Sequence, residues 1–313
     1  MAERIPAPDI GDIQRTVLPS RALWLTVRDT LCDARRAALA DAVRAARRLA
    51  KKKKVDDDLL GATVLEAMWE AVSCLELAAN VAAPWVDHQM DSPHGRWAEM
   101  TKYDPSRVNR FYESSHKWTD ERFAALFGHR FDDGQSLVDI LSSTGFEDER
   151  FSGAFEQAET ATTTFLRDRF KSLAAHWGGL RGYAAAYEHG LLLVPSAYGE
   201  AVDEKNQPLS QHLIAWATRK DAVLWPGDTT ITQLIDLAES AGGLAIDLAD
   251  YVADARLRLV ESLEFDGDKV FLRPLQNPIP YWVKEGDLSE ESIEVLDRMR
   301  LNWVNRAQGD TST

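Results

Sequence analysis

Three arginines are each followed by a histidine six or seven residues later. The pairs are Arg110/His116, Arg122/His129 and Arg169/His176. This spacing is about two turns of a helix, so on a helix both side chains of a pair lie on one face. A histidine can transfer protons near neutral pH, and an arginine can neutralise phosphate charge. Such a pair could therefore act on a phosphodiester, while a structural histidine in the core or at the surface would give the same pattern.

The arginine–histidine spacing resembles the active-site motif of the helical ribonucleases called HEPN domains. The resemblance implies that a pair converges, usually across a dimer, on a scissile phosphodiester of RNA without a metal ion. Arg169/His176 is the preferred pair, because its helix is central in the chain and Trp177 could stack on a base. A phenylalanine follows each of the three arginines, where the motif commonly has a polar residue.

A run of basic residues ends the first predicted helix. Its cations are Arg44, Arg47, Arg48, Lys51, Lys52, Lys53 and Lys54. Three aspartates follow at 56–58. Cations at the end of one helix and anions at the start of the next both complement helix dipoles, which favours a solvated corner between two helices. Under the ribonuclease hypothesis the same run would be the phosphate-binding surface for RNA.

No motif in the sequence indicates a metal ion or a cofactor. The chain has no glycine-rich phosphate loop, nucleophile elbow, CxxC pair or HExxH helix. Two histidines and two aspartates lie close together within residues 87–94. A metal site needs three or four converging ligands, and no second cluster matches this one. We therefore expect a polar loop there, with no metal and no cofactor.

Apolar side chains recur at helical spacing over most of the chain between residues 21 and 303. Long helices are expected over 105–129, 160–188 and 230–263, with start signals at Asp104-Pro105, at Thr229 or Thr230, and at Ser289. Strand-like runs occur only at 191–194, 213–218 and 269–272. The pattern predicts a mainly α fold: a multi-helix bundle with a small antiparallel β-hairpin or three-stranded sheet in the C-terminal half.

The predicted organisation has an extended N-terminal arm over residues 1–19, which is rich in proline. A charged, glycine-containing connection near 145–153 separates an N-terminal helical half, 20–145, from a C-terminal helical half, 150–306. The small sheet belongs to the second half. The alternative is one compact domain, since the 313 residues fit either arrangement.

Composition is that of an ordinary globular protein, with 45% hydrophobic and 27% charged residues. The net charge of −14 argues against a general nucleic-acid coat and against binding to an anionic membrane surface. Two distant cysteines, Cys32 and Cys74, indicate a reducing compartment. No apolar run approaches the roughly eighteen residues of a membrane span. We expect a cytoplasmic protein.

Two classes of function are left open. The first is a non-enzymatic binding or assembly protein, with a homodimer or another protein as partner. Many aromatic residues, an acidic surface and the lack of an identifiable catalytic set favour it. The second is a HEPN-like, metal-independent ribonuclease of the toxin or defence type. RNA is expected as a ligand only under this second hypothesis.

Overall fold

The computed structural model describes residues 19–52, 57–86, 93–102, 104–128, 130, 136–138, 149–188, 195–196, 209–212, 225–261, 263–266, 269–272, 282–283, 288–298 and 304–305. Helices make up 92% of the part of the chain that is described in full, and eight α-helices lie in that part. The predicted helical bundle is therefore present.

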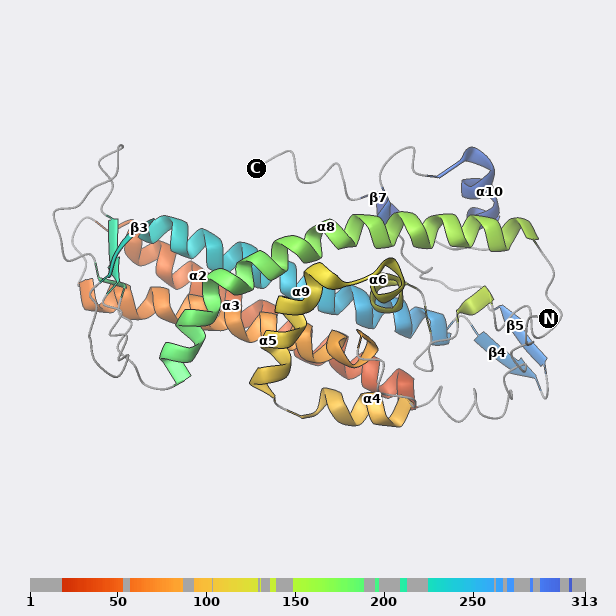
Figure 1. The fold of residues 1–313 in the computed structure, drawn as a ribbon, viewed down its shortest axis with the longest axis horizontal. Helices are drawn as coiled ribbons and strands as arrows, with labels where there is room; N and C mark the ends of the chain where they lie inside the picture. The colour runs from red at the N-terminus through yellow and green to blue at the C-terminus, as the bar shows by residue number, and fades with distance from the viewer. Residues whose placement is uncertain are drawn as a thin grey trace. The chain divides into compact units, whose positions relative to one another are not determined.

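Helices follow one another along most of the described chain (Figure 1). The first helical stretch begins at residue 19 and is π-helical over Thr26–Cys32. The remaining helices are α2 (Asp33–Ala50), α3 (Asp57–Val86), α4 (Pro93–Met100), α5 (Pro105–Ser114), the 3₁₀ turn η2 (Ser115–Lys117), α6 (Asp120–Phe127), α8 (Glu149–Glu188), α9 (Ile231–Glu261) and α10 (Glu290–Arg298).

Short strands are described as backbone, without the surroundings of their side chains except at Thr230. They are β1 (Pro195–Ser196), β2 (Leu209–His212), β3 (Trp225–Thr230), β4 (Leu263–Asp266), β5 (Lys269–Leu272), β6 (Trp282–Val283) and β7 (Val304–Asn305). The pairings β1–β2, β2–β3 and β4–β5 are antiparallel, and β6–β7 is parallel.

The predicted hairpin or three-stranded sheet in the C-terminal half is wrong, because the part of the chain described in full contains no strand, sheet or hairpin. The runs 191–194 and 213–218 lie outside the described residues. The run 269–272 is β5, and its backbone partner is β4 rather than either of those runs. The misreading has a physical cause: short apolar runs carry too little periodicity to define a strand or its partner.

Two predicted helix boundaries also need correction. The long central helix α8 begins at Glu149, eleven residues before the predicted start at Thr160. The predicted helix over 105–129 is instead α5, η2 and α6. It breaks because Trp118 and Thr119 have extended backbones, with ψ angles of 135° and 166°. A break here re-aims the side chains that follow, and the site below depends on it.

The chain divides into two compact units, each built from segments distant in sequence. The first unit combines Met1–Thr30, Asn80–Lys171 and Leu248–Thr313. The second combines Leu31–Ala79 and Ser172–Asp247. The predicted division into two helical halves, 20–145 and 150–306, stays a prediction.

In the second unit, α2 and α3 pack against the N-terminal part of α9. Thr230 caps α9: its hydroxyl accepts from the Gln233 backbone N–H at 3.2 Å, while the Gln233 side chain accepts from the Thr230 N–H at 2.8 Å. Such a reciprocal pair satisfies two orphan donors at the helix start. Arg47 of α2 forms ion pairs with Asp236 and Glu239 of α9.

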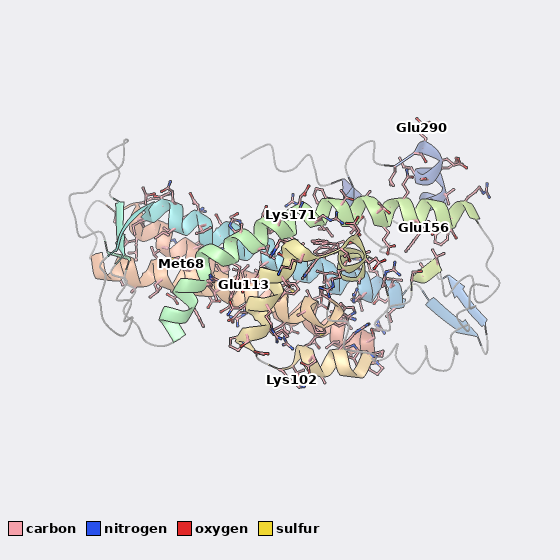
Figure 2. All side chains as sticks on the ribbon, in the orientation of Figure 1. Met68, Lys102, Glu113, Glu156, Lys171 and Glu290 are labelled. Carbon is pink, nitrogen blue, oxygen red and sulfur yellow. The ribbon has the colours of Figure 1, made fainter. Side chains whose placement is uncertain are left out.

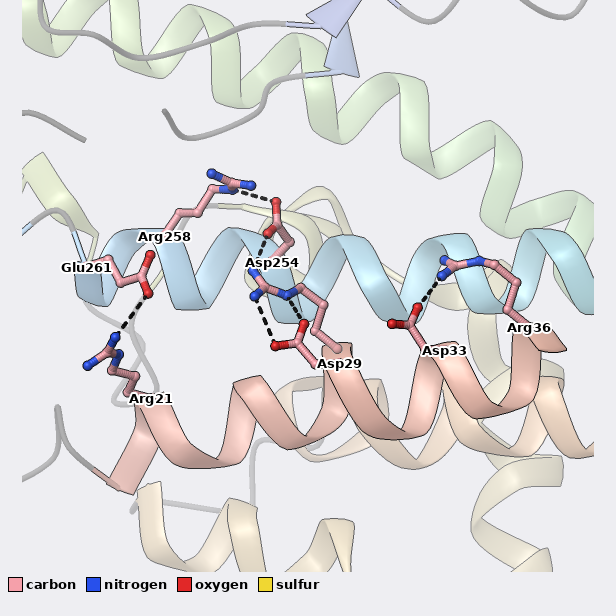
Figure 3. Close-up of polar contacts among 8 residues, drawn as sticks. Arg21, Asp29, Asp33, Arg36, Asp254, Arg258 and Glu261 are labelled. Atoms are coloured by element: carbon pink, nitrogen blue, oxygen red, sulfur yellow. Dashed lines mark hydrogen bonds and ion pairs between the residues drawn. The ribbon is translucent and has the colours of Figure 1, made fainter. Parts of the chain in front are cut away.

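In the first unit, ion pairs join the helical stretch that begins at residue 19 to the C-terminal part of α9 (Figure 3). Arg28 donates to Asp254 at 3.0 Å, and Arg258 donates to the other oxygen of the same carboxylate at 2.7 Å. Arg28 also donates to Asp29, and this hydrogen bond lowers the pKa of Asp29. Arg21 lies 3.7 Å from Glu261. These contacts tie together segments far apart in the sequence.

Adjacent glycines in α9 give a matched test of helix packing in the second unit. A Cβ at Gly242 would lie 2.6 Å from Leu39 Cδ2 and 3.2 Å from Ala71 Cα, whereas a Cβ at Gly243 would meet nothing within 4 Å. We expect Gly242→Ala to lower the free energy of unfolding by about 1–3 kcal/mol through overpacking. Gly243→Ala should raise it by up to about 1 kcal/mol, because alanine favours the helix. Chemical denaturation of both variants checks this, and equal effects would contradict the close approach.

Candidate functional site

A cluster of aromatic rings surrounds Phe170 of α8, whose residue is 1% exposed. Phe170 contacts five rings, with centroid distances from 4.9 Å for Trp118 to 6.2 Å for Tyr112. The five are Phe111, Tyr112, Trp118, Phe123 and Phe127. Since aromatic pairs at these separations are worth roughly 0.5–1.5 kcal/mol beyond their burial, the cluster fixes α5, η2 and α6 against α8.

The phenylalanines that follow the three arginines all belong to this cluster. Phe111 and Phe123 lie 5.3 and 5.8 Å from Phe170. The departure from the polar residue of the ribonuclease motif therefore has a packing role here. Because each phenylalanine is an anchor, the arginines before two of them, Arg110 and Arg122, are brought to the rim of one pocket.

The pocket has a volume of about 490 Å³ and lies within the first unit. Its charged lining residues are Arg107, Arg110, Glu113, Lys117 and Arg122. They come from α5, η2 and α6, and the break in the predicted helix 105–129 is what lets Arg122 of α6 face the same space as the others. Four cations and one carboxylate therefore line a cavity of this size.

Arg107 is held in place by acceptors on several segments. One guanidinium nitrogen donates to the Glu99 carbonyl at 2.7 Å and to the Glu99 carboxylate at 3.1 Å. The other donates to Asn80 Oδ1 at 3.0 Å and to the Lys102 carbonyl. The side chain is only 13% exposed. Arg107 is therefore a fixed positive charge in the pocket wall.

Arg110 and Lys117 are more accessible than Arg107. The Arg110 side chain is 74% exposed and lies 3.7 Å from Asp104. Lys117 is exposed at the end of η2, and no ion pair links it to another residue of the described ranges. Long exposed cations of this kind can turn toward a ligand at little cost.

The apolar wall of the pocket includes Phe111 and Trp118. Trp118 stacks on Phe170 with an interplanar angle of 19°, and its indole N–H donates to Ser114 Oγ at 3.2 Å. Phe111 is 5% exposed and Trp118 is 9% exposed. Because both rings are nearly buried and Phe170 stacks on Trp118, the pocket offers charge rather than a platform for stacking a base.

The end of α6 is fixed by two side chains of α9, within the same unit. The Tyr251 hydroxyl donates to the Phe127 carbonyl at 3.3 Å, and Arg256 donates to the Ala125 carbonyl at 3.3 Å. These carbonyls are among the four that a helix leaves without intrahelical partners at its C-terminus. Burial raises the pKa of Tyr251, which therefore stays a neutral donor.

Arg256 is itself buried, with 1% of its residue surface exposed. Its guanidinium carbon lies 4.8 Å from the ring centroid of Trp85 and 5.6 Å from that of Trp24. Cation–π contacts of this kind are worth about 2 kcal/mol or more when desolvated. The same arginine thus holds both α6 and the two tryptophans.

The predicted arginine–histidine pairs have different locations. Arg169 and His176 are both half-buried on α8, but Arg169 belongs to the first unit and His176 to the second. The Arg169 guanidinium lies over the Phe165 ring at 4.9 Å. Burial lowers the pKa of His176. Their catalytic role stays a prediction.

Of the two alternative pairs, Arg110/His116 is interrupted where α5 ends. Arg110 lies on α5, and His116 is exposed on η2. Arg122 lies on α6, while His129 is outside the described residues. An uninterrupted two-turn spacing therefore applies to Arg169/His176 alone. The pocket instead joins Arg110 to Arg122, which belong to different predicted pairs.

The basic run at the end of α2 is partly neutralised. Arg44 pairs with Asp41, and Arg47 pairs with Asp236 and Glu239, which raises the pKa of Arg47. The exposed cations Arg48, Lys51 and Lys52 have no ion pair with the described part of the chain. Lys53 and Lys54 lie outside the described residues. A role for this run in RNA binding stays a prediction.

Among the residues that the structure describes, no group of three or more His, Cys, Asp or Glu side chains could hold a metal ion. Residues 87–92 of the predicted polar loop lie outside that description, as does the side chain of His94. No helix in the described ranges is long and apolar enough to cross a membrane. The chain matches no protein-family model, no curated protein and no solved structure.

Sequence reasoning missed Arg107, Glu113 and Lys117 as parts of a site. The signal was available in their spacing, because residues 107, 110, 113 and 117 lie three or four apart and so share a helix face. What the spacing could not give is the second wall, formed by Arg122 of α6 and by Ala83 and Val86 of α3.

Removing Arg107 should destabilise the first unit far more than removing Arg110. Arg107→Ala removes one donor from each of four acceptors, the Glu99 carboxylate, the Glu99 and Lys102 carbonyls and Asn80 Oδ1, so we expect a loss of about 2–4 kcal/mol in the free energy of unfolding. Arg110→Ala removes an exposed side chain and should cost under about 0.5 kcal/mol. Chemical denaturation of the two variants measures the difference. Similar small losses in both would contradict the role of Arg107 as a fixed wall.

Proposed function

We propose that this chain is a non-enzymatic binding protein whose pocket takes an anionic group of its ligand. The observation that carries the proposal is the convergence of Arg107, Arg110, Lys117 and Arg122 on one cavity of about 490 Å³. In a chain with a net charge of −14, such a concentration of cations gives an anion a local attraction.

The balance of charges around the pocket supports this proposal. The lining has four cations against one carboxylate, that of Glu113. Two further carboxylates, Glu99 and Asp104, pair with Arg107 and Arg110. Even with these included, the site keeps a net positive charge. Guanidinium groups suit phosphate and carboxylate oxygens, because their N–H donors match the acceptors in pairs.

A HEPN-like ribonuclease is the second candidate, and one observation favours it. Arg110 and Arg122 border the same pocket, and His116 lies on the turn between them. The residues described as lining the pocket include no histidine, so the acid–base group that cleavage requires is not among them. The binding function therefore has the stronger support.

Location and partners complete the proposal. Cys32 and Cys74 are both buried and form no disulfide, and burial raises the pKa of the Cys74 thiol to about 12. Buried cysteines without a disulfide suit the reducing conditions of the cytoplasm. A second copy of the chain or another protein would be the partner if the anionic group belongs to a macromolecule.

The proposal is tested by removing two of the lining cations. We expect the full chain to bind inorganic phosphate in calorimetry at low salt, and Lys117→Gln with Arg122→Gln to weaken binding by about tenfold or more, since each charged contact is worth roughly 1.5 kcal/mol or above. The control is Arg48→Gln with Lys171→Gln, which makes the same charge change at exposed residues outside the pocket.

Absence of phosphate binding by the unaltered chain would overturn the binding proposal, and so would equal losses in the two double variants. Structured RNA incubated under the same conditions separates the second candidate. Cleavage that persists with chelator and is lost in His116→Ala would favour the ribonuclease.

A further inference from the structure

Glu113 is the one carboxylate among the described residues that line the pocket. It lies on α5 between Arg110 and Lys117, and its side chain is exposed (Figure 2). The order of charges along this face of α5 and η2 is thus positive, negative, positive. The Glu113 carboxylate therefore stands beside the cations to which the proposed function assigns an anion.

The carboxylate affects a bound anion in two opposite ways. It repels the negative charge, because two unit charges about 8 Å apart interact with roughly 1 kcal/mol at an effective dielectric constant near 40. It also accepts hydrogen bonds, and a bond to a charged group is worth about 1.5–3 kcal/mol. A ligand gains from Glu113 only when it presents a donor beside its anionic group.

The cations indicate what kind of anion fits. Two guanidinium groups and one ammonium, on Arg110, Arg122 and Lys117, supply more donors than a carboxylate with two oxygens can use. A phosphate monoester has three terminal oxygens and nearly two negative charges. A hydroxyl on a carbon near the phosphate is the simplest group of such a ligand that could donate a hydrogen bond to Glu113.

The apolar wall argues against a nucleobase as the other part of the ligand. Trp118 stacks on Phe170, and both Trp118 and Phe111 are nearly buried, so a base has little ring surface to stack on. Ala83 and Val86 of α3 complete that wall with small side chains. The pocket is therefore suited to a small, flexible ligand without an aromatic ring.

We propose that Glu113 makes the pocket selective for a small hydroxylated phosphate monoester, such as a polyol or sugar phosphate, over an anion without a neighbouring hydroxyl. The inference rests on the proposed anion-binding function and adds the ligand class and the residue that selects it. The phosphate is held by Arg110, Lys117 and Arg122, and the Glu113 carboxylate accepts a hydrogen bond from the hydroxyl.

The test compares two phosphate monoesters that differ in their hydroxyls. Calorimetry at pH 8, where both are dianions, measures binding of glycerol 3-phosphate and methyl phosphate to the full chain. We expect glycerol 3-phosphate to bind about tenfold more tightly, because only it can donate to Glu113. Glu113→Gln should tighten methyl phosphate by about threefold to tenfold by removing repulsion, and should reduce the preference for glycerol 3-phosphate to about threefold or less.

A matched control is Glu121→Gln, which removes the same charge from an exposed residue of α6 that does not line the pocket. It should leave the preference for glycerol 3-phosphate unchanged. Equal affinity for the two esters in the unaltered chain would overturn the selectivity of Glu113 while leaving anion binding intact. An unchanged preference in Glu113→Gln would do the same. Failure of both esters and of inorganic phosphate to bind would overturn the binding function itself.

Discussion

The packing of aromatic rings around Phe170 is the constraint on which the site depends. The pocket is carried by α5, η2 and α6. Helix α5 contributes Phe111 to the cluster and α6 contributes Phe123, while η2 ends beside Trp118. Trp118 joins the cluster because the chain leaves the helix there and becomes extended. The turn places Lys117 at the pocket and lets α6 bring Arg122 to its rim. On one continuous helix, Lys117 and Arg122 would lie on different faces.

A second constraint comes from α9, which satisfies the end of α6 with Tyr251 and Arg256. Both donors are buried, so leaving either carbonyl without its donor would cost roughly 1–3 kcal/mol of stability. Arg256 is in turn enclosed by Trp24 and Trp85. This base fixes the backbone of α6, from which Arg122 reaches the pocket.

The sequence predicts the helices well where the signals are local. Asp104 caps α5 by accepting from the Ser106 N–H, Thr230 caps α9, and Ser289 accepts from the Ser292 N–H at the start of α10. Boundaries fail where tertiary packing decides. Gly153 was expected in a loop, yet it lies within α8 with open space around it, so the helix continues. The break at Trp118 carries no glycine or proline signal and depends on the ring cluster.

The site shows the same division between local and tertiary information. Arg110 and Arg122 were selected from the sequence, but each was paired with a histidine rather than with the other. The pocket forms because α3, α5 and α6 meet, and no spacing along one helix contains that meeting. The predicted sheet failed for a related reason, since a sheet is defined by strand partners that one strand's own residues do not specify.

The most direct measurement is the indole N–H resonance of Trp118 during a phosphate titration, assigned by its disappearance in Trp118→Phe. This group lies in the pocket wall beside Lys117, whereas Trp24 and Trp85 lie around Arg256 and serve as internal references. If the cations of the pocket bind an anion, the Trp118 resonance shifts and saturates while the references stay in place. A Trp118 shift that grows linearly with salt, or that matches those of Trp24 and Trp85, would contradict the account.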